Sequence, residues 1–216
     1  MGSRGPLLNE RLSDEFSVTR FARVHRTEKI RKDPKRSARS IARLRYQTED
    51  GPPEVYLVLR ARRDSKKRVW IQIRVPGRPN GRKGWVRREA LGPVRTVRTH
   101  LRINRTTLRA TLYKAGKTIW SSPVGIGAKG TETPRGRFWI RDRLKGFGGS
   151  YGPFAFATAA YSKLSEWPGG GVIGIHGTDQ PGLIPGRPSH GCIRVPNFKV
   201  VQLERLMPVG TSVQIL

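Results

Sequence analysis

A cysteine and two histidines lie close together in the last part of the sequence. Cys192 is the only cysteine of the 216-residue chain; His190 lies two positions before it and His176 sixteen positions before it. In an extended segment, side chains two positions apart point to the same face, so we expect His190 and Cys192 to face the same way. A thiol of ordinary pKa is mostly protonated near neutral pH, and a nearby imidazole can take its proton. The spacing predicts a cysteine nucleophile with a histidine base.

Two other interpretations of these residues remain open. A lone cysteine is commonly a small buried hydrophobe, and histidines can be satisfied within a core. His176, His190 and Cys192 could also ligate zinc, with Asp179 as the neighbouring carboxylate. The sequence has neither a His-Glu-x-x-His segment nor a second cysteine, so it excludes a cysteine-rich zinc ribbon and an intrachain disulfide.

The elements that would position these side chains are mostly short strands. His176 ends the apolar run 172–175, and strand ends are where catalytic groups commonly lie. Residues 151–195 hold nine glycines and five prolines, too many for long helices. Only residues 198–206 have a helical pattern, closed by Pro208 and Gly210. The other expected strands are 55–59, 69–75, 85–87, 101–103, 108–113, 118–120, 138–140 and 212–215.

The strands fall into two groups, which predicts two domains. Residues 1–18 are polar and unpatterned, and we expect a tail or linker there. Residues 19–93 should form a small β-barrel, although 19–50 fit a strand or a helix equally well; Gly92-Pro93 is the expected boundary. Residues 97–216 should form a second, β-rich domain with one short carboxy-terminal helix. The fold class is therefore mainly β.

The charge is strongly positive and uneven along the chain. The net charge is +28, of which the first 100 residues carry +17 and residues 151–216 only +2. Such a field attracts polyanions, among them nucleic acid, anionic lipid and acidic wall polymers, but it can also be a solvated face. No apolar run is long enough for a transmembrane helix, and the first ten residues contain no apolar signal-peptide core.

Four segments in the right order resemble one known family, the L,D-transpeptidase catalytic domain with the YkuD-type fold. They are Ile-His-Gly-Thr at 175–178, Ser-His-Gly-Cys-Ile-Arg at 189–194, Thr-Pro-Arg-Gly-Arg-Phe at 133–138 and the closing strand at 208–215. The resemblance covers roughly residues 97–216. Residues 70–75 and 79–86 resemble, more weakly, a bacterial Src-homology-three-like barrel, a module that often precedes such catalytic domains.

The resemblance implies a role for each residue of the motif. Cys192 would attack the carbonyl of the third residue of a peptidoglycan stem peptide and expel the terminal D-alanine. His176 would act as base and then acid, its ring oriented by the carbonyl of Gly177. The backbone N–H groups of Gly191 and Cys192 would form the oxyanion hole. An amine of a second stem peptide would then resolve the thioester and form a cross-link.

Three further residues of the motif have less defined roles. His190 would shape the pocket or bind substrate, and Ser189, in the same substrate-binding set, would hold the turn and not react itself. Arg194 would either pair with a substrate carboxylate or brace the loop. Tyr151, in the glycine-rich approach to the site, could belong to a substrate lid.

The resemblance also implies partners and a location. We expect peptidoglycan stem peptides as substrates, anionic wall polymers as possible ligands of the basic first half, no nucleic acid, no cofactor and no metal. The family works outside the cytoplasmic membrane, so we expect the same here, although the sequence shows no export signal. Two alternatives remain: a basic wall- or polyanion-binding module with little catalysis, and an L,D-carboxypeptidase that uses water as acceptor.

The remaining histidines and the tryptophans receive structural assignments. We expect His25 and His100 to be exposed, because their neighbours in the sequence are basic and polar. The tryptophans should serve core or barrel packing; they are residues 70, 85, 120, 139 and 167.

Overall fold

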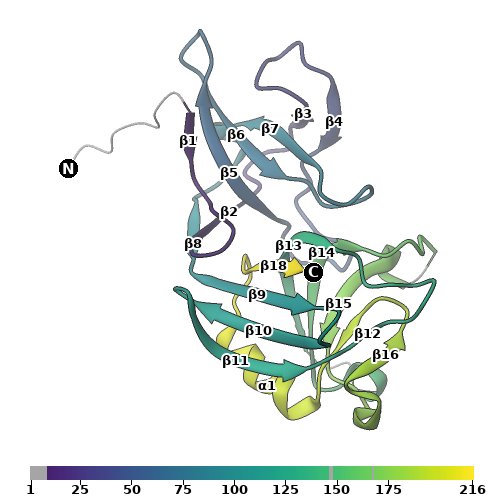
Figure 1. Cartoon of the computed structure of the whole chain (residues 1–216). Coiled ribbons are helices and arrows are strands. Elements are labelled where there is room, and N and C mark those ends of the chain that lie inside the picture. Colours follow the sequence, from purple (N-terminus) through teal and green to yellow (C-terminus); the bar gives the residue numbers. More distant parts are fainter. Residues whose placement is uncertain (1–8, 146–147, 167) are drawn as a thin grey trace.

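The chain folds into two β-sheets that lie one above the other (Figure 1). The computed structural model describes residues 9–145, 148–166 and 168–216. Those residues contain one α-helix, so the expected mainly β fold is confirmed. None of their helices has the length and apolarity needed to cross a membrane.

The amino-terminal sheet has eight strands in the order β4-β3-β7-β6-β5-β2-β8, and β1 adds to β5. All its pairings are antiparallel, and among the described residues its outer strands β4 and β8 do not pair with each other. Residues 19–50, which fitted either a strand or a helix, contain three short strands. The barrel of Src-homology-three type stays a prediction. The strands are β1 (Asn9–Arg11), β2 (Thr19–Arg23), β3 (Lys29–Arg31), β4 (Ser40–Arg43), β5 (Val55–Arg63), β6 (Val69–Arg74), β7 (Lys83–Arg87) and β8 (Arg95–Val97), with the 3-10 turn η1 (Arg88–Ala90).

The carboxy-terminal sheet has ten strands in the order β11-β10-β9-β18-β13-β14-β15-β17-β12-β16. Three of its pairings are parallel: β9 with β18, β15 with β17, and β12 with β16. The strands are β9 (Thr99–Asn104), β10 (Arg109–Lys114), β11 (Lys117–Pro123), β12 (Gly125–Gly127), β13 (Gly136–Lys145), β14 (Phe154–Tyr161), β15 (Val172–His176), β16 (Gly186–Ser189), β17 (Ile193–Arg194) and β18 (Ser212–Ile215). The helices are α1 (Asn197–Leu206) and the 3-10 turns η2 (Gly149–Tyr151), η3 (Pro168–Gly171) and η4 (Pro181–Leu183).

The start of the described chain differs from the expected tail. Residues 9–11 form β1 on the edge of β5, and Ser13 is buried. The Ser13 hydroxyl donates to the carbonyl of Val58 at 2.6 Å and accepts from the N–H of Arg20 at 2.7 Å. The polar composition of this segment therefore reflects hydrogen bonds to strands far along the chain. The expected domain boundary at Gly92-Pro93 also differs from the structure. β8 (Arg95–Val97) still pairs with β2, so the amino-terminal sheet extends to residue 97.

His100 is the other correction: it is buried, at 2% exposure, although its neighbours in the sequence are polar. It lies on β9, where Nδ1 is 2.9 Å from the hydroxyl of Ser212 and the ring contacts Phe16 and Tyr113. His100 and the exposed Arg102 share one face of β9, so His100 is buried because Phe16 and Tyr113 cover its ring. Burial lowers the pKa of His100 to about 4, and the charge of Arg137 acts in the same direction.

Apolar side chains cross the junction between the two sheets. Phe21, Val55 and Leu57 of the amino-terminal sheet belong to the core cluster of the carboxy-terminal sheet. Phe21 packs so closely on Gly210 that a Cβ there would lie 2.2 Å from the Phe21 ring. Four tryptophans are buried as expected, and Trp167 lies outside the described residues. The buried tryptophans are Trp70, Trp85, Trp120 and Trp139.

Charged side chains also join the two sheets, in a buried network. Arg141 of β13, 2% exposed, donates from Nε to Glu54 at 2.9 Å, from Nη2 to Glu49 at 2.8 Å and from Nη1 to the Tyr161 hydroxyl at 3.0 Å. The Tyr161 hydroxyl in turn donates to Glu49 at 2.6 Å. Burial alone would raise the pKa of Glu49, but Tyr161 and the Arg141 charge outweigh it and lower the pKa to about 2. Arg141 is thus paired with two carboxylates from the segment between β4 and β5, and Arg45 of that segment donates to the same two carboxylates at 3.1 Å.

Candidate active site

The cysteine and both histidines of the motif line one small cavity of about 120 Å³. It lies beside β15 and the turn that joins β16 to β17. Six of the side chains around it are Cys192, His176, His190, Tyr151, Ser162 and Arg194. The segments 175–178 and 189–194, separated in sequence, therefore meet in space.

The thiol of Cys192 is partly buried and receives a backbone hydrogen bond. The N–H of Gly174 donates to Sγ at 3.3 Å. Burial raises the pKa of the Cys192 thiol, while the Gly174 N–H and the charge of Arg194 oppose that rise. The resting group is thus a neutral thiol, and the Gly174 N–H would stabilise the thiolate once the proton leaves.

His176 ends β15 and is buried, with its ring held by its own neighbour. Nδ1 lies 2.6 Å from the carbonyl oxygen of Gly177. Because a carbonyl only accepts, Nδ1 carries the proton, and in the neutral ring Nε2 is the unprotonated nitrogen. Burial lowers the pKa of His176, only partly offset by the Gly177 bond. The ring is therefore neutral at physiological pH and can accept a proton at Nε2. Its centroid lies 4.8 Å from the centroid of the Tyr151 ring.

Gly174 lies between the two reactive side chains. A Cβ built on Gly174 would be 3.6 Å from His176 Cδ2 and 3.8 Å from Cys192 Sγ. The imidazole and the thiol thus flank one point in space, with only a hydrogen atom of Gly174 directed there. This arrangement can support proton transfer from thiol to imidazole as a nucleophile attacks.

The turn that carries the nucleophile is not an extended strand, contrary to the expectation for residues 190–192. β16 ends at Ser189, and Gly191 has φ +125°, which L side chains rarely adopt. A Cβ at Gly191 would also lie 2.8 Å from Ile173 Cδ1. His190 and Cys192 both reach the cavity, although through a turn and not through alternation along a strand.

The Ser189 hydroxyl bridges the two sides of this turn. It donates to the carbonyl of Cys192 at 2.6 Å and accepts from the N–H of Gly191 at 3.1 Å. The Gly191 N–H is therefore engaged in this structure, and its use as an oxyanion donor would require that bond to break. The simple expectation of two ready donors is thus not met at Gly191.

Two side chains outside the predicted set support the site. Thr133, fully buried, donates to the carbonyl of Gly191 at 2.7 Å and accepts from the N–H of Gly127 at 3.0 Å. Asn197, at the start of α1, accepts from the N–H of Thr178 at 2.8 Å. Its Oδ1 lies so close to Gly177 that a Cβ there would be 2.3 Å away. These contacts fix the carbonyls of Gly191 and Gly177 from behind.

Arg194 lies on β17 at the edge of the cavity. Its Nη1 donates to Oε1 of Gln180 at 3.0 Å and so links β17 to the loop that follows β15, while the role of Arg194 toward substrate stays a prediction. Its charge lowers the pKa of both Cys192 and His176. In the part of the chain that the structure describes, no group of three or more His, Cys, Asp or Glu side chains has metal-site geometry.

Sequence reasoning missed Gly174, Asn197 and the role of Thr133. A signal existed for Gly174, since a glycine within an apolar strand often marks close approach of another group. Thr133 was part of a recognised segment, but its acceptor lies 58 residues away. No local pattern could reveal that contact.

Comparisons with known proteins identify the carboxy-terminal part. Residues 98–215 match the family described as the L,D-transpeptidase catalytic domain, YkuD. A protein named "Putative L,D-transpeptidase YkuD" from Bacillus licheniformis is 36% identical over 113 residues, covering 52% of this chain and 61% of that protein. Its namesake from Bacillus subtilis is 32% identical over 120 residues, covering 56% of this chain and 67% of that protein. The chain thus spans about three fifths to two thirds of these curated relatives.

The likeness to solved structures is weaker. L,D-transpeptidase 3 from Mycobacterium tuberculosis matches with a TM-score of 0.47 and 11% identity, covering 69% of this chain and 91% of that one. The family match alone extends over more than half of the chain, from the start of the carboxy-terminal sheet to its last strand. The chain belongs to the YkuD family of L,D-transpeptidase catalytic domains.

Proposed function

We propose that this protein is a peptidoglycan L,D-transpeptidase with Cys192 as nucleophile. The observation that carries the proposal is the Gly174 N–H bond to the Cys192 sulfur, in a cavity shared with a neutral, oriented His176. A buried thiol kept only for packing needs neither a donor on its sulfur nor an imidazole beside it. Membership of the family supplies the reaction type.

The first half-reaction follows from this geometry. Nε2 of His176 takes the thiol proton as Sγ attacks the carbonyl carbon of the third stem-peptide residue. The tetrahedral intermediate collapses as the bond to the terminal D-alanine breaks, and His176 returns the proton to the leaving amine. A thioester on Cys192 remains. The Cys192 N–H stabilises the oxyanion, joined by Gly191 if its bond to Ser189 opens.

The second half-reaction releases the acyl group. An amine of another stem peptide, deprotonated by His176, attacks the thioester carbonyl; the C–S bond breaks and Cys192 takes back the proton. His190 and Arg194, at the rim of the same cavity, bind the stem peptide. Water in place of the amine would make the enzyme an L,D-carboxypeptidase, and both outcomes share every step up to the thioester.

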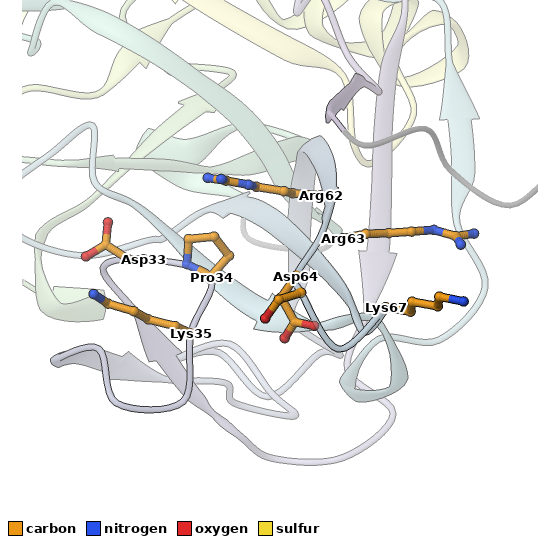
Figure 2. Close-up of a pocket in the computed structure, with 8 residues that line it drawn as sticks. Asp33, Pro34, Lys35, Arg62, Arg63, Asp64 and Lys67 are labelled. Atoms are coloured by element: carbon orange, nitrogen blue, oxygen red, sulfur yellow. The ribbon is translucent and has the colours of Figure 1, made fainter.

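A second proposal concerns the basic amino-terminal sheet, which we infer binds anionic wall polymer outside the cytoplasmic membrane. Its support is the charge distribution and a surface hollow of about 790 Å³ with four basic side chains: Lys35, Arg62, Arg63 and Lys67 (Figure 2). In Figure 2 the Arg63 and Lys67 side chains point away from Asp33, which lines the same hollow together with Asp64. This hollow holds no cysteine or histidine.

One assay tests the reaction and separates its two endings. The purified chain is incubated with a disaccharide-tetrapeptide, with and without a diamino-acid amine acceptor, and free D-alanine and cross-linked product are measured by mass spectrometry. We expect D-alanine release and cross-linked product only when Cys192 is present, with Cys192→Ser as control. Tripeptide without cross-link would instead identify the carboxypeptidase, and no D-alanine from a folded wild type would refute both.

A further inference from the structure

The loop between β6 and β7 reaches from the amino-terminal sheet onto the end of β14, where Asn80 pairs with Tyr161. Asn80 Nδ2 donates to the carbonyl of Tyr161 at 2.8 Å, and the N–H of Tyr161 donates back to Asn80 Oδ1 at 3.0 Å. The Asn80 side chain thus forms with the Tyr161 backbone the pair of hydrogen bonds that a neighbouring strand would form. Tyr161 is held a second time from the same sheet, through the bond of its hydroxyl to Glu49.

Arg78 of the same loop binds the chain that follows β14. Its Nε donates to the carbonyl of Ser162 at 2.9 Å, and its Nη2 donates to the carbonyls of Leu164 at 3.1 Å and Gly170 at 3.0 Å. Its guanidinium also lies over the Tyr161 ring, 5.2 Å from the ring centre. Three converging carbonyls suit a planar guanidinium with several donors, whereas a lysine ammonium is a single point charge.

One residue that Arg78 bonds to, Ser162, lines the catalytic cavity, and another, Gly170, directly precedes the lining residue Gly171. Ser162 and Gly171 both line that cavity, and the N–H of Ser162 donates to the carbonyl of Gly171 at 2.8 Å. Gly171 has φ +76°, and a Cβ there would lie 2.2 Å from the Leu164 oxygen and 2.5 Å from Arg78 Nη2. β15 starts at the next residue and ends at His176. The loop therefore holds the wall from which the catalytic strand begins.

We propose that Arg78 and Asn80 are positioning residues for the transpeptidase reaction, so that the amino-terminal sheet completes the substrate site. They contact neither the Cys192 thiol nor the His176 imidazole. They hold the backbone of Ser162 and Gly171 in the position that the cavity wall needs for the stem peptide to fit. The inference rests on the proposed function and adds a task for the amino-terminal sheet besides binding wall polymer.

The test compares Arg78→Gln with Arg31→Gln in the full chain. Arg31 also donates to a carbonyl, that of Ala38 at 2.9 Å, but within the amino-terminal sheet, so both variants lose one charge and the control leaves the wall intact. We expect Arg78→Gln to raise KM for the tetrapeptide about tenfold, because three carbonyls of the wall lose their charged donor, with kcat changed less than about threefold. The rate at which iodoacetamide alkylates Cys192 does not depend on stem-peptide binding, so in Arg78→Gln it should stay within about twofold of the wild-type rate.

A second readout follows the wall itself. The Ser162 amide should exchange with solvent at least about tenfold faster in Arg78→Gln than in Arg31→Gln, because its bond to Gly171 opens more often. Asn80→Ala, a smaller change, should shift KM and exchange in the same direction. Equal KM and equal exchange in the Arg78 and Arg31 variants would overturn the inference. Failure of the proposed function would show instead in the wild type, as absence of D-alanine release.

Discussion

Replacing Thr133 by valine would remove one hydroxyl group from behind the catalytic turn and change little else in shape. That hydroxyl donates to the carbonyl of Gly191 and accepts from the N–H of Gly127, and the side chain is fully buried. A buried polar group left without a partner costs about 1–3 kcal/mol. With two groups orphaned and some relaxation, we expect a loss of about 2–4 kcal/mol in the free energy of unfolding.

Part of that cost should appear in catalysis, because Gly191 precedes the nucleophile. If restoring the turn raises the activation free energy of acylation by about 1.4 kcal/mol, the acylation rate falls about tenfold. The assay is stopped-flow acylation by a carbapenem, with thermal unfolding measured on the same samples. A loss of this size should lower the melting temperature by about 10 °C for a chain of this length.

Thr211→Val provides the matched control. Thr211 is equally buried, donates to the carbonyl of Pro208 at 2.6 Å and lies 2.6 Å from the hydroxyl of Thr99, far from the cavity lining. We expect a comparable loss of stability and an acylation rate within about twofold of wild type. Equal acylation rates in the Thr133 and Thr211 variants would refute the claim that Thr133 positions the turn.

Three further predictions concern titration and the junction of the sheets. Since burial lowers the pKa of His176, the acid limb of the acylation rate should be centred below the ordinary imidazole pKa of about 6.5, and a limb centred above it would contradict a buried, neutral base. The pKa of His100 is about 4 in the folded chain against 6.5 when unfolded, so the unfolded state takes up the proton first; stability should be complete above pH 6.5 and decline by about 3 kcal/mol as pH falls to 4, and His100→Gln, compared with wild type in urea titrations, should lack that part of the slope. Arg141→Met should cost about 3 kcal/mol in urea unfolding, because it leaves the fully buried Glu54 carboxylate with the more exposed Arg45 as its remaining charged partner; Arg143→Met, at a more exposed side chain of the same strand, should cost less than about 1 kcal/mol, and equal losses would show that the buried network adds nothing.

Several strands and the meeting of Cys192 with His176 could be predicted from local pattern. Alternating apolar residues predicted β6, and the apolar run ending at His176 predicted β15 with His176 at its end. The helix at 198–206 differs from α1 by one residue, because its periodic residues and the following Pro208 define it locally. The contact of His176 with the Gly177 carbonyl was implied by the family resemblance, and the structure contains it.

The errors and omissions share a physical cause. The polar composition of residues 9–11 predicts a tail, yet these residues form a strand. Their strand partners on β5 lie about 50 residues away, and local composition cannot indicate such a pairing. The basic and polar neighbours of His100 in the sequence predict that it is exposed, whereas Phe16 and Tyr113, from other segments, cover its ring. The contacts of Arg78 and Asn80 span 81 to 92 residues, so only the fold brings them to the cavity wall.

The most direct test of the central claim is intact-mass analysis after incubation with a carbapenem, on the wild type and on Cys192→Ala. An activated thiol in an acyl-accepting cavity predicts a single covalent adduct on the wild type and none on the variant. Cys192→Ala should still unfold at nearly the wild-type temperature, which shows that loss of the adduct is not loss of fold. A folded wild type that stays unmodified, or a variant that gains the same adduct, would contradict the assignment of Cys192 as the nucleophile.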